Sequence, residues 1–144
     1  MRPNRDQYFL MLAHAAAQRS TCRRRKVGAV LVDASGRILS TGYNGSPGGY
    51  PHCEELGCDL EKPCQWSVHA EINALLFAEN RAPDKTLYVT TAPCRACALA
   101  IANAGVRRVV VAEKFRAEDG VSGQDVLQRG GIAIDELPAP SWRV

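Results

Sequence analysis

The hydrophobic pattern near the start of the chain has a helical period. Apolar residues between Phe9 and Ala17 recur at the spacing of one helix face. Asn4 precedes them in the position of an N-cap, and Gln7 follows three residues later, as in a capping box. The pattern predicts a first helix over residues 4–19.

Two short runs with strand-like composition follow this helix. Residues 27–32 are rich in branched apolar side chains, residues 33–36 carry turn chemistry, and residues 37–41 form a second run. These features predict an antiparallel hairpin. Residues 42–66 contain several glycines and prolines, and a loop of that length in a compact domain is usually functional or held in place by another group.

The second half of the chain alternates between helices and strands. The predicted elements are a helix from Ser67 to about Glu79, a strand at 86–90, a helix from Pro93 to Gly105, a strand at 108–112, a helix at 123–128 and a strand at 132–134. Because helices join the later strands, we expect these strands to run parallel. The predicted fold class is α/β, with three layers: a mixed five-stranded sheet and helices on both faces. We expect a single domain over 1–144, with a tail at 138–144.

Composition narrows the class of protein. The chain has 144 residues, of which 46% are hydrophobic and 23% charged, as in an ordinary globular domain. No apolar run approaches the ~20 residues of a membrane-spanning helix, and a net charge of +3 is too small to indicate nucleic acid by itself. Six cysteines in a chain large enough to build its own core favour metal binding over disulfides, so we expect a cytoplasmic protein.

Four residues have the spacing of a catalytic zinc site. His69 and Glu71 stand at the start of one predicted helix, and Cys94 and Cys97 at the start of the next. One imidazole and two thiolates leave the fourth tetrahedral position of Zn²⁺ free for water, and Glu71 is close enough to move protons to and from it. This is the known signature of zinc-dependent nucleobase deaminases. The alternative is a metal-free histidine with two buried thiols.

The sequence resembles the deoxycytidylate (dCMP) deaminase family of the cytidine deaminase superfamily. Beyond the zinc motif, the resemblance rests on residues 19–22, 26–30, 41–47, 69–74 and 87–90. The Gly-Tyr-Asn-Gly segment within 41–47 favours dCMP enzymes over tRNA adenosine deaminases. The resemblance implies zinc-dependent hydrolytic deamination of dCMP to dUMP, with release of ammonia.

The resemblance also implies roles for residues outside the zinc motif. Asn44 would bond the sugar hydroxyl, the backbone N–H of Ala70 would address the pyrimidine carbonyl, and Val27 would pack near the base. Phe115 stands where many members have a tyrosine, which alters the substrate contacts expected there. The family forms homo-oligomers, as hexamers or dimer-based assemblies.

A basic run follows the first predicted helix. It is a candidate for binding the substrate phosphate or an effector triphosphate, because guanidinium groups match phosphate geometry. The run comprises Arg23, Arg24, Arg25 and Lys26. One alternative is that these side chains only face the solvent. Another is that they bind a polynucleotide, although no aromatic residues interleave with the arginines. Some family members respond to dCTP and dTTP near the loop that here contains Tyr43 and Gly45.

Four cysteines remain outside the catalytic motif. Several dCMP deaminases hold a second, structural zinc with cysteines at positions resembling Cys22 and Cys53. Cys58 and Cys64 would complete a closed tetrahedral site, with His52 as a competing ligand. Free thiols or a disulfide are the alternatives.

The leading hypothesis is therefore a dCMP deaminase. A deaminase acting on a 5-substituted or triphosphate deoxycytidine nucleotide, or on single-stranded nucleic acid, is the alternative within the same chemistry. A non-catalytic, nucleotide-sensing zinc module is the alternative from another class. Glu71 argues against that module, because a sensor has no use for a proton shuttle.

Overall fold

The computed structural model describes residues 2–53, 55, 57–62, 64–78 and 82–139. The elements in chain order are α1 (Arg5–Ala17), β1 (Gly28–Val32), β2 (Ile38–Tyr43), α2 (Ala70–Leu76), β3 (Lys85–Val89), α3 (Arg95–Asn103), β4 (Val106–Val111), α4 (Gly123–Arg129) and β5 (Ala133–Glu136). All the predicted elements are present in the predicted order. Residues 140–144 of the predicted tail, and Glu79 at the predicted end of the second helix, lie outside the described residues.

The strands form one mixed sheet in the order β2-β1-β3-β4-β5. β1 pairs antiparallel with both β2 and β3, whereas β3, β4 and β5 run parallel. Helices α3 and α4 provide the crossovers that parallel neighbours require. The predicted five-stranded sheet, with its hairpin at one edge, is confirmed.

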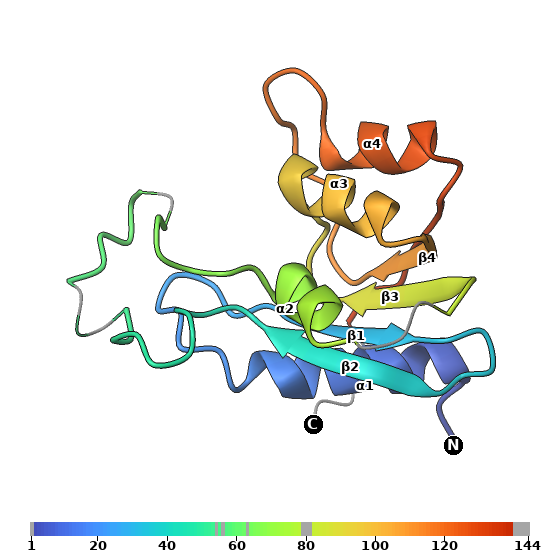
Figure 1. Cartoon of the computed structure of the whole chain (residues 1–144), viewed down its shortest axis with the longest axis horizontal. Helices are drawn as coiled ribbons and strands as arrows, with labels where there is room; N and C mark the ends of the chain where they lie inside the picture. Colours follow the sequence, from blue (N-terminus) through green and yellow to red (C-terminus); the bar gives the residue numbers. More distant parts are fainter. Residues whose placement is uncertain (1, 54, 56, 63, 79–81, 140–144) are drawn as a thin grey trace.

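Helices cover both faces of this sheet, as predicted. On one face, α1 places Phe9 and Leu10 against Val30 of β1 and Tyr88 of β3. On the other face, α2, α3 and α4 share a larger core with the opposite side chains of the central strands, among them the fully buried Leu87. Figure 1 shows α1 below the sheet and the other three helices on its opposite side. No helix in the described part of the chain has the length and hydropathy of a membrane span.

The start of α2 differs from the prediction. Ser67 was expected to cap the helix, but His69 occupies the N-cap position and makes no side-chain capping bond. The reason is a backbone bridge between Gly45 and Val68, whose N–H groups donate to each other's carbonyl oxygens at 3.2 and 2.8 Å. This bridge keeps the chain extended through Val68, so that the helix starts only at Ala70.

Candidate active site

Two helix N-termini bring three metal-binding side chains together. His69 is the N-cap of α2, Cys94 is the N-cap of α3, and Cys97 lies in the first turn of α3. The His69 Nδ1 atom lies 3.2 Å from Cys97 Sγ and 3.7 Å from Cys94 Sγ. All three ligand atoms lie within 4.8 Å of one another. The strand between the two helices therefore returns the chain to the same end of the sheet.

The spacing of this triad fits a zinc ion. Tetrahedral Zn²⁺ with ordinary Zn–S and Zn–N bonds places sulfur and nitrogen ligands about 3.5 Å apart. The two measured separations from His69 Nδ1, 3.2 and 3.7 Å, lie on either side of that value. Three protein ligands leave one coordination position open, which is the arrangement of catalytic zinc sites.

The electrostatics of the two thiols also suit a cation. Hydrogen bonds from Cys97 and His69 lower the pKa of Cys94 to about 3, so this thiol is a thiolate at neutral pH. The Cys94 thiolate and burial raise the pKa of Cys97 well above its ordinary value. A hydrogen bond to Cys94 likewise raises the pKa of His69. A divalent ion between them would favour the thiolate form of both cysteines and the neutral form of the imidazole.

Glu71 is buried beside the triad. Its exposed fraction is 3%, although it carries an ionisable carboxyl group in the first turn of α2. Burial raises the pKa of Glu71 above the ordinary value for glutamate. A carboxyl that takes up a proton more readily than usual is suited to accept one and then donate it within a single reaction.

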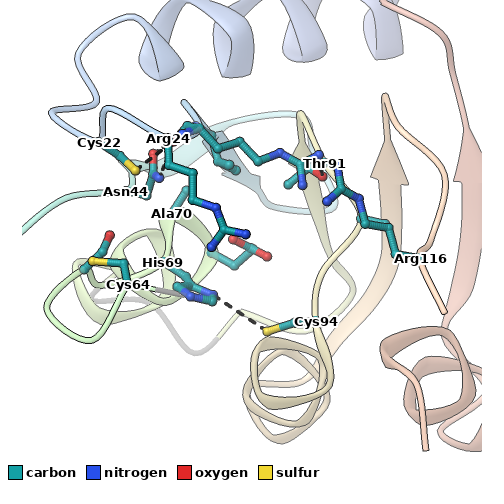
Figure 2. A pocket seen from close by; sticks show the side chains of 14 residues that line it. Cys22, Arg24, Asn44, Cys64, His69, Ala70, Thr91, Cys94 and Arg116 are labelled. Atoms are coloured by element: carbon teal, nitrogen blue, oxygen red, sulfur yellow. Dashed lines mark hydrogen bonds between the residues drawn. The ribbon is translucent and has the colours of Figure 1, made fainter. Parts of the chain in front are cut away.

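A cavity of about 470 Å³ opens onto these residues, a volume typical of small-molecule sites. It is lined by Cys22, Arg24, Arg25, Val27, Asn44, Cys64, Ser67, His69, Ala70, Glu71, Thr91, Ala92, Cys94 and Arg116. The structure thus gathers two residues of the metal triad, the buried carboxyl group and most of the substrate-binding candidates around one space. Figure 2 shows His69 and Cys94 at one side of it and Asn44 at another.

Asn44 is held rigidly at the cavity wall. Its Oδ1 accepts hydrogen bonds from Ser20 Oγ at 2.6 Å and from the Val27 N–H at 2.9 Å. Its Nδ2 donates to the carbonyl oxygen of Arg25 at 2.7 Å. Since an amide nitrogen carries two hydrogens, this arrangement leaves one N–H of Asn44 for another acceptor.

Three arginines surround the cavity. Arg24 Nη1 donates to the Lys62 carbonyl oxygen at 3.1 Å, which ties the long loop to the basic run. Arg25 donates to Thr91 Oγ1 at 2.6 Å and forms an ion pair with Glu113. Figure 2 shows the Arg24 guanidinium pointing toward His69, while Arg116 reaches in from the opposite side toward Thr91.

Other candidates lie away from this cavity. Phe115 packs against the core beneath the three helices. Tyr43 is exposed, and its carbonyl oxygen accepts a hydrogen bond from Asn73. Gly45 forms the backbone bridge to Val68. Arg23 and Lys26, the other two residues of the basic run, are exposed and line a separate cavity of about 250 Å³ formed by residues 20–26.

The four other cysteines are spread over two cavities. Cys22 and Cys64 line the candidate active site, and Cys64 also lines a neighbouring cavity of about 330 Å³ with Cys53 and Cys58. Burial raises the pKa of Cys53, Ser46 opposes this shift, and the nearby Cys64 and Cys22 thiols add to it. Within the described residues, only the catalytic triad brings three His, Cys, Asp or Glu ligand atoms within 4.8 Å of one another. His52 is exposed.

Sequence reasoning did not single out Arg116 or Thr91 as site residues. Both follow the carboxyl ends of neighbouring parallel strands, β4 and β3. Ligands of open α/β sheets gather at the carboxyl ends of parallel strands. That rule, applied to the predicted strands, would have pointed to both residues.

A three-layer α/β fold with a His/Cys/Cys triad and a buried glutamate at two helix N-termini is the architecture of the zinc-dependent deaminases. Residues 3–113 match the sequence model of a protein family described as "cytidine and deoxycytidylate deaminase zinc-binding region". The chain therefore belongs to the cytidine and deoxycytidylate deaminase family.

Individual relatives agree with this assignment. The chain is 38% identical to the deoxycytidylate deaminase of Saccharomyces cerevisiae over 95% of its own length, but it spans only 46% of that protein. It is 45% identical to the deoxycytidylate deaminase of Mycobacterium phage D29, with 76% of this chain and 94% of the relative covered. The dCMP deaminase of cyanophage S-TIM5, solved in complex with dCMP and dUMP, superimposes with a TM-score of 0.81 at 34% identity, covering 95% and 99% of the two chains.

Proposed function

We propose that this protein catalyses the zinc-dependent hydrolysis of dCMP to dUMP and ammonia. The observation that carries the proposal is one shared cavity, lined by the buried Glu71, by His69 and Cys94 of the metal triad, and by three arginines. The triad and carboxyl group suit hydrolytic deamination, and the arginines suit a phosphorylated substrate. The solved complex of the similar cyanophage enzyme with dCMP and dUMP supports the choice of nucleotide.

The chain's own residues divide the chemistry between them. His69, Cys94 and Cys97 would hold Zn²⁺, which when bound supplies an activated water for attack on the carbon that carries the amino group. Glu71 accepts a proton from that water, delivers one to the ring nitrogen, and assists departure of the amine as ammonia. Water and dCMP are consumed, and dUMP and ammonia are formed, so that atoms and charge balance.

The cavity wall offers groups that would orient the nucleoside. The N–H of Ala70 belongs to the first turn of α2, where backbone donors have no partner within the helix, and we assign it to the pyrimidine carbonyl. The remaining Nδ2–H of Asn44 is assigned to the sugar hydroxyl. Val27 lines the same wall and would pack against the base.

The arginines favour a monophosphate. Arg25 is already paired with Glu113 and bonded to Thr91, which neutralises much of its charge. Arg24 and Arg116 then supply two guanidinium groups for the substrate phosphate from different sides of the cavity. Two guanidinium groups match the charge of one phosphate.

A second, structural zinc bound by Cys22, Cys53, Cys58 and Cys64 is part of the proposal. Its first support is that Cys53, Cys58 and Cys64 line one cavity. Its second is that the Cys64 and Cys22 thiols lie close enough to Cys53 to raise the pKa of that thiol. Two zinc ions per chain by elemental analysis, falling to one in Cys58→Ser, would support this site. One zinc per chain in the unmodified protein would overturn it.

We also propose a homo-oligomer that responds to nucleoside triphosphates. Leu76 and Phe77, at the end of α2, are 68% and 72% exposed and give this helix an apolar surface for a second copy of the chain. Arg23 and Lys26, at the small cavity of residues 20–26, suit an anionic effector such as dCTP or dTTP. Light scattering, and rates measured with added dCTP or dTTP, test the two statements separately. The cytoplasmic location stays a prediction.

The substrate is tested by measuring ammonia release from several cytosine compounds in parallel. The compounds are dCMP, CMP, deoxycytidine, dCTP, 5-methyl-dCMP and a short cytosine-containing DNA strand. We expect dCMP to have the highest kcat/KM, and deoxycytidine to be a poor substrate because it lacks the phosphate. Preferred turnover of the DNA strand or of dCTP would overturn the substrate assignment, and no turnover of any compound by zinc-loaded protein would overturn the function.

A further inference from the structure

The carboxylate of Glu118 joins the N-termini of α3 and α4. Its Oε1 accepts a hydrogen bond from the backbone N–H of Arg95 at 3.1 Å, and its Oε2 accepts one from the N–H of Gly123 at 2.7 Å. Arg95 and Gly123 are the first residues of their helices. One side chain thereby satisfies a free donor of each helix, where a negative charge is also favoured by the helix dipole.

The contact is reciprocal. The Arg95 side chain donates from Nη1 to the carbonyl oxygens of Asp119 and Val121, both at 2.9 Å. The two helix ends are also in direct contact, because a Cβ at Gly123 would lie 2.1 Å from the Pro93 carbonyl oxygen. Residues 118–121 are thus fixed to α3 by backbone and side-chain bonds together. Figure 1 shows this segment as the orange loop above the left end of α3.

These contacts lie next to the metal site, because Cys94, one of the three candidate metal ligands, directly precedes α3. Cys94 is the N-cap of α3, and its side chain makes no capping bond but faces His69. The Glu118 carboxylate, from another part of the chain, instead accepts the N–H of Arg95, the residue directly after this metal ligand. Arg116, which lines the cavity, lies only two residues before Glu118.

We propose that Glu118 is a positioning residue, which holds the metal ligand Cys94 and the cavity residue Arg116 in a fixed relation. It does not touch the reacting atoms. The inference rests on the proposed function, since it assigns Cys94 to zinc and Arg116 to the substrate phosphate.

The test compares zinc retention and kinetics in Glu118→Ala and the unmodified protein. Loss of a residue that orients a metal ligand typically lowers metal affinity about 10–100-fold. We expect Glu118→Ala to lose zinc to a chelator at least about tenfold faster, and to show a KM for dCMP raised by about the same factor. Glu118→Gln keeps only one acceptor oxygen, so its rate of zinc loss and its KM should lie between those of Glu118→Ala and the unmodified protein. If Glu118→Ala does not fold, Glu118→Gln takes its place in the comparison.

Asp125→Ala is the matched control. Asp125 also caps the N-terminus of α4, through bonds to Ser122, but it makes no contact with α3 among the interactions of the described residues. It should lower the melting temperature and leave zinc loss and KM unchanged. Equal zinc loss and equal KM in the Glu118 and Asp125 variants would overturn the positioning role. Failure of the unmodified protein to deaminate dCMP would instead count against the proposed function, since chelator-driven zinc loss is measured without turnover.

Discussion

Gly42 of β2 lies against the backbone of α2 at Ala70. A Cβ at Gly42 would stand 2.3 Å from the Ala70 carbonyl oxygen and 2.6 Å from the Ala74 nitrogen, far inside van der Waals contact. The first turn of α2, which carries Glu71, therefore rests directly on the strand. This close approach limits how far the helix that carries Glu71 can stand from the sheet.

Gly42→Ala is expected to destabilise the protein and displace α2. Overpacking of this kind typically costs about 1–3 kcal/mol, and here backbone atoms must move. Urea unfolding should show the loss of stability, and kcat should fall with it. Gly48→Ala is the control, because a Cβ at Gly48 meets no atom within 4 Å. Equal unfolding midpoints for the two variants would contradict the tight contact.

Asn44→Ala should impair both stability and substrate binding. It leaves the Val27 N–H and the Arg25 carbonyl without their partner, and a buried unsatisfied group costs about 1–3 kcal/mol. Asn44→Asp retains the acceptor for Val27 and Ser20 but loses the donor. We expect both variants to raise the KM for dCMP, with the larger loss of unfolding free energy in the alanine variant. An unchanged KM in both would remove Asn44 from the substrate site.

Acid stability should depend on the ion pair between Asp6 of α1 and Arg108 of β4. Arg108 donates to both Asp6 oxygens, at 2.9 and 2.8 Å, and this hydrogen bonding holds the pKa of Asp6 below its ordinary value of 3.8. Since the folded pKa is depressed, the stabilisation is fully present above the unfolded pKa and is lost as the pH falls through the folded pKa.

Asp6→Asn should therefore reduce stability at pH 7 and flatten the loss of stability between about pH 5 and pH 2. Because both side chains are about one-third exposed, the expected effect at pH 7 is discounted to about 1 kcal/mol. Thermal unfolding across this pH range measures it. Asp59→Asn, at an exposed pair with Lys62, should leave the curve unchanged. If the stability of Asp6→Asn falls with pH in parallel with that of the unmodified protein, the Asp6–Arg108 pair does not contribute to acid stability.

Removal of zinc should lower stability as well as activity. A metal that binds only the folded state adds about 2.7 kcal/mol at a free concentration of 100 times its dissociation constant. Chelation should therefore lower the melting temperature, and added Zn²⁺ should restore it. Cys97→Ala should show a smaller response, because the catalytic site loses one of its three ligands while the proposed structural zinc keeps all of its own. A melting temperature insensitive to chelator would contradict the assignment of the triad.

The sequence predicted the parts of this protein that depend on local pattern. The period of apolar residues gave the order of elements, and the spacing of His69, Glu71, Cys94 and Cys97 predicted the group that the fold gathers. Contacts between distant segments were not predicted. The bridge from Gly45 to Val68 displaced the start of α2, and it joins residues 23 positions apart.

The same limit applies to the cavity walls. Arg116 and Thr91 follow different strands, and their proximity depends on the parallel pairing of β3 with β4. Phe115, the neighbour of Arg116, is partly buried against the core and does not line the cavity. Which of two adjacent side chains faces the site depends on the path of the chain after β4, and hydrophobic periodicity does not specify that path.

The most direct test of the account is ammonia release from dCMP by zinc-loaded protein and by Glu71→Gln, with zinc content measured in both. Glutamine is similar in size to glutamate but cannot carry the proton, and a positioned acid–base group contributes about 10²–10⁴ in rate. We predict that Glu71→Gln retains the catalytic zinc and loses at least about a hundredfold in kcat. Turnover of dCMP by this variant at the rate of the unmodified protein would contradict the account.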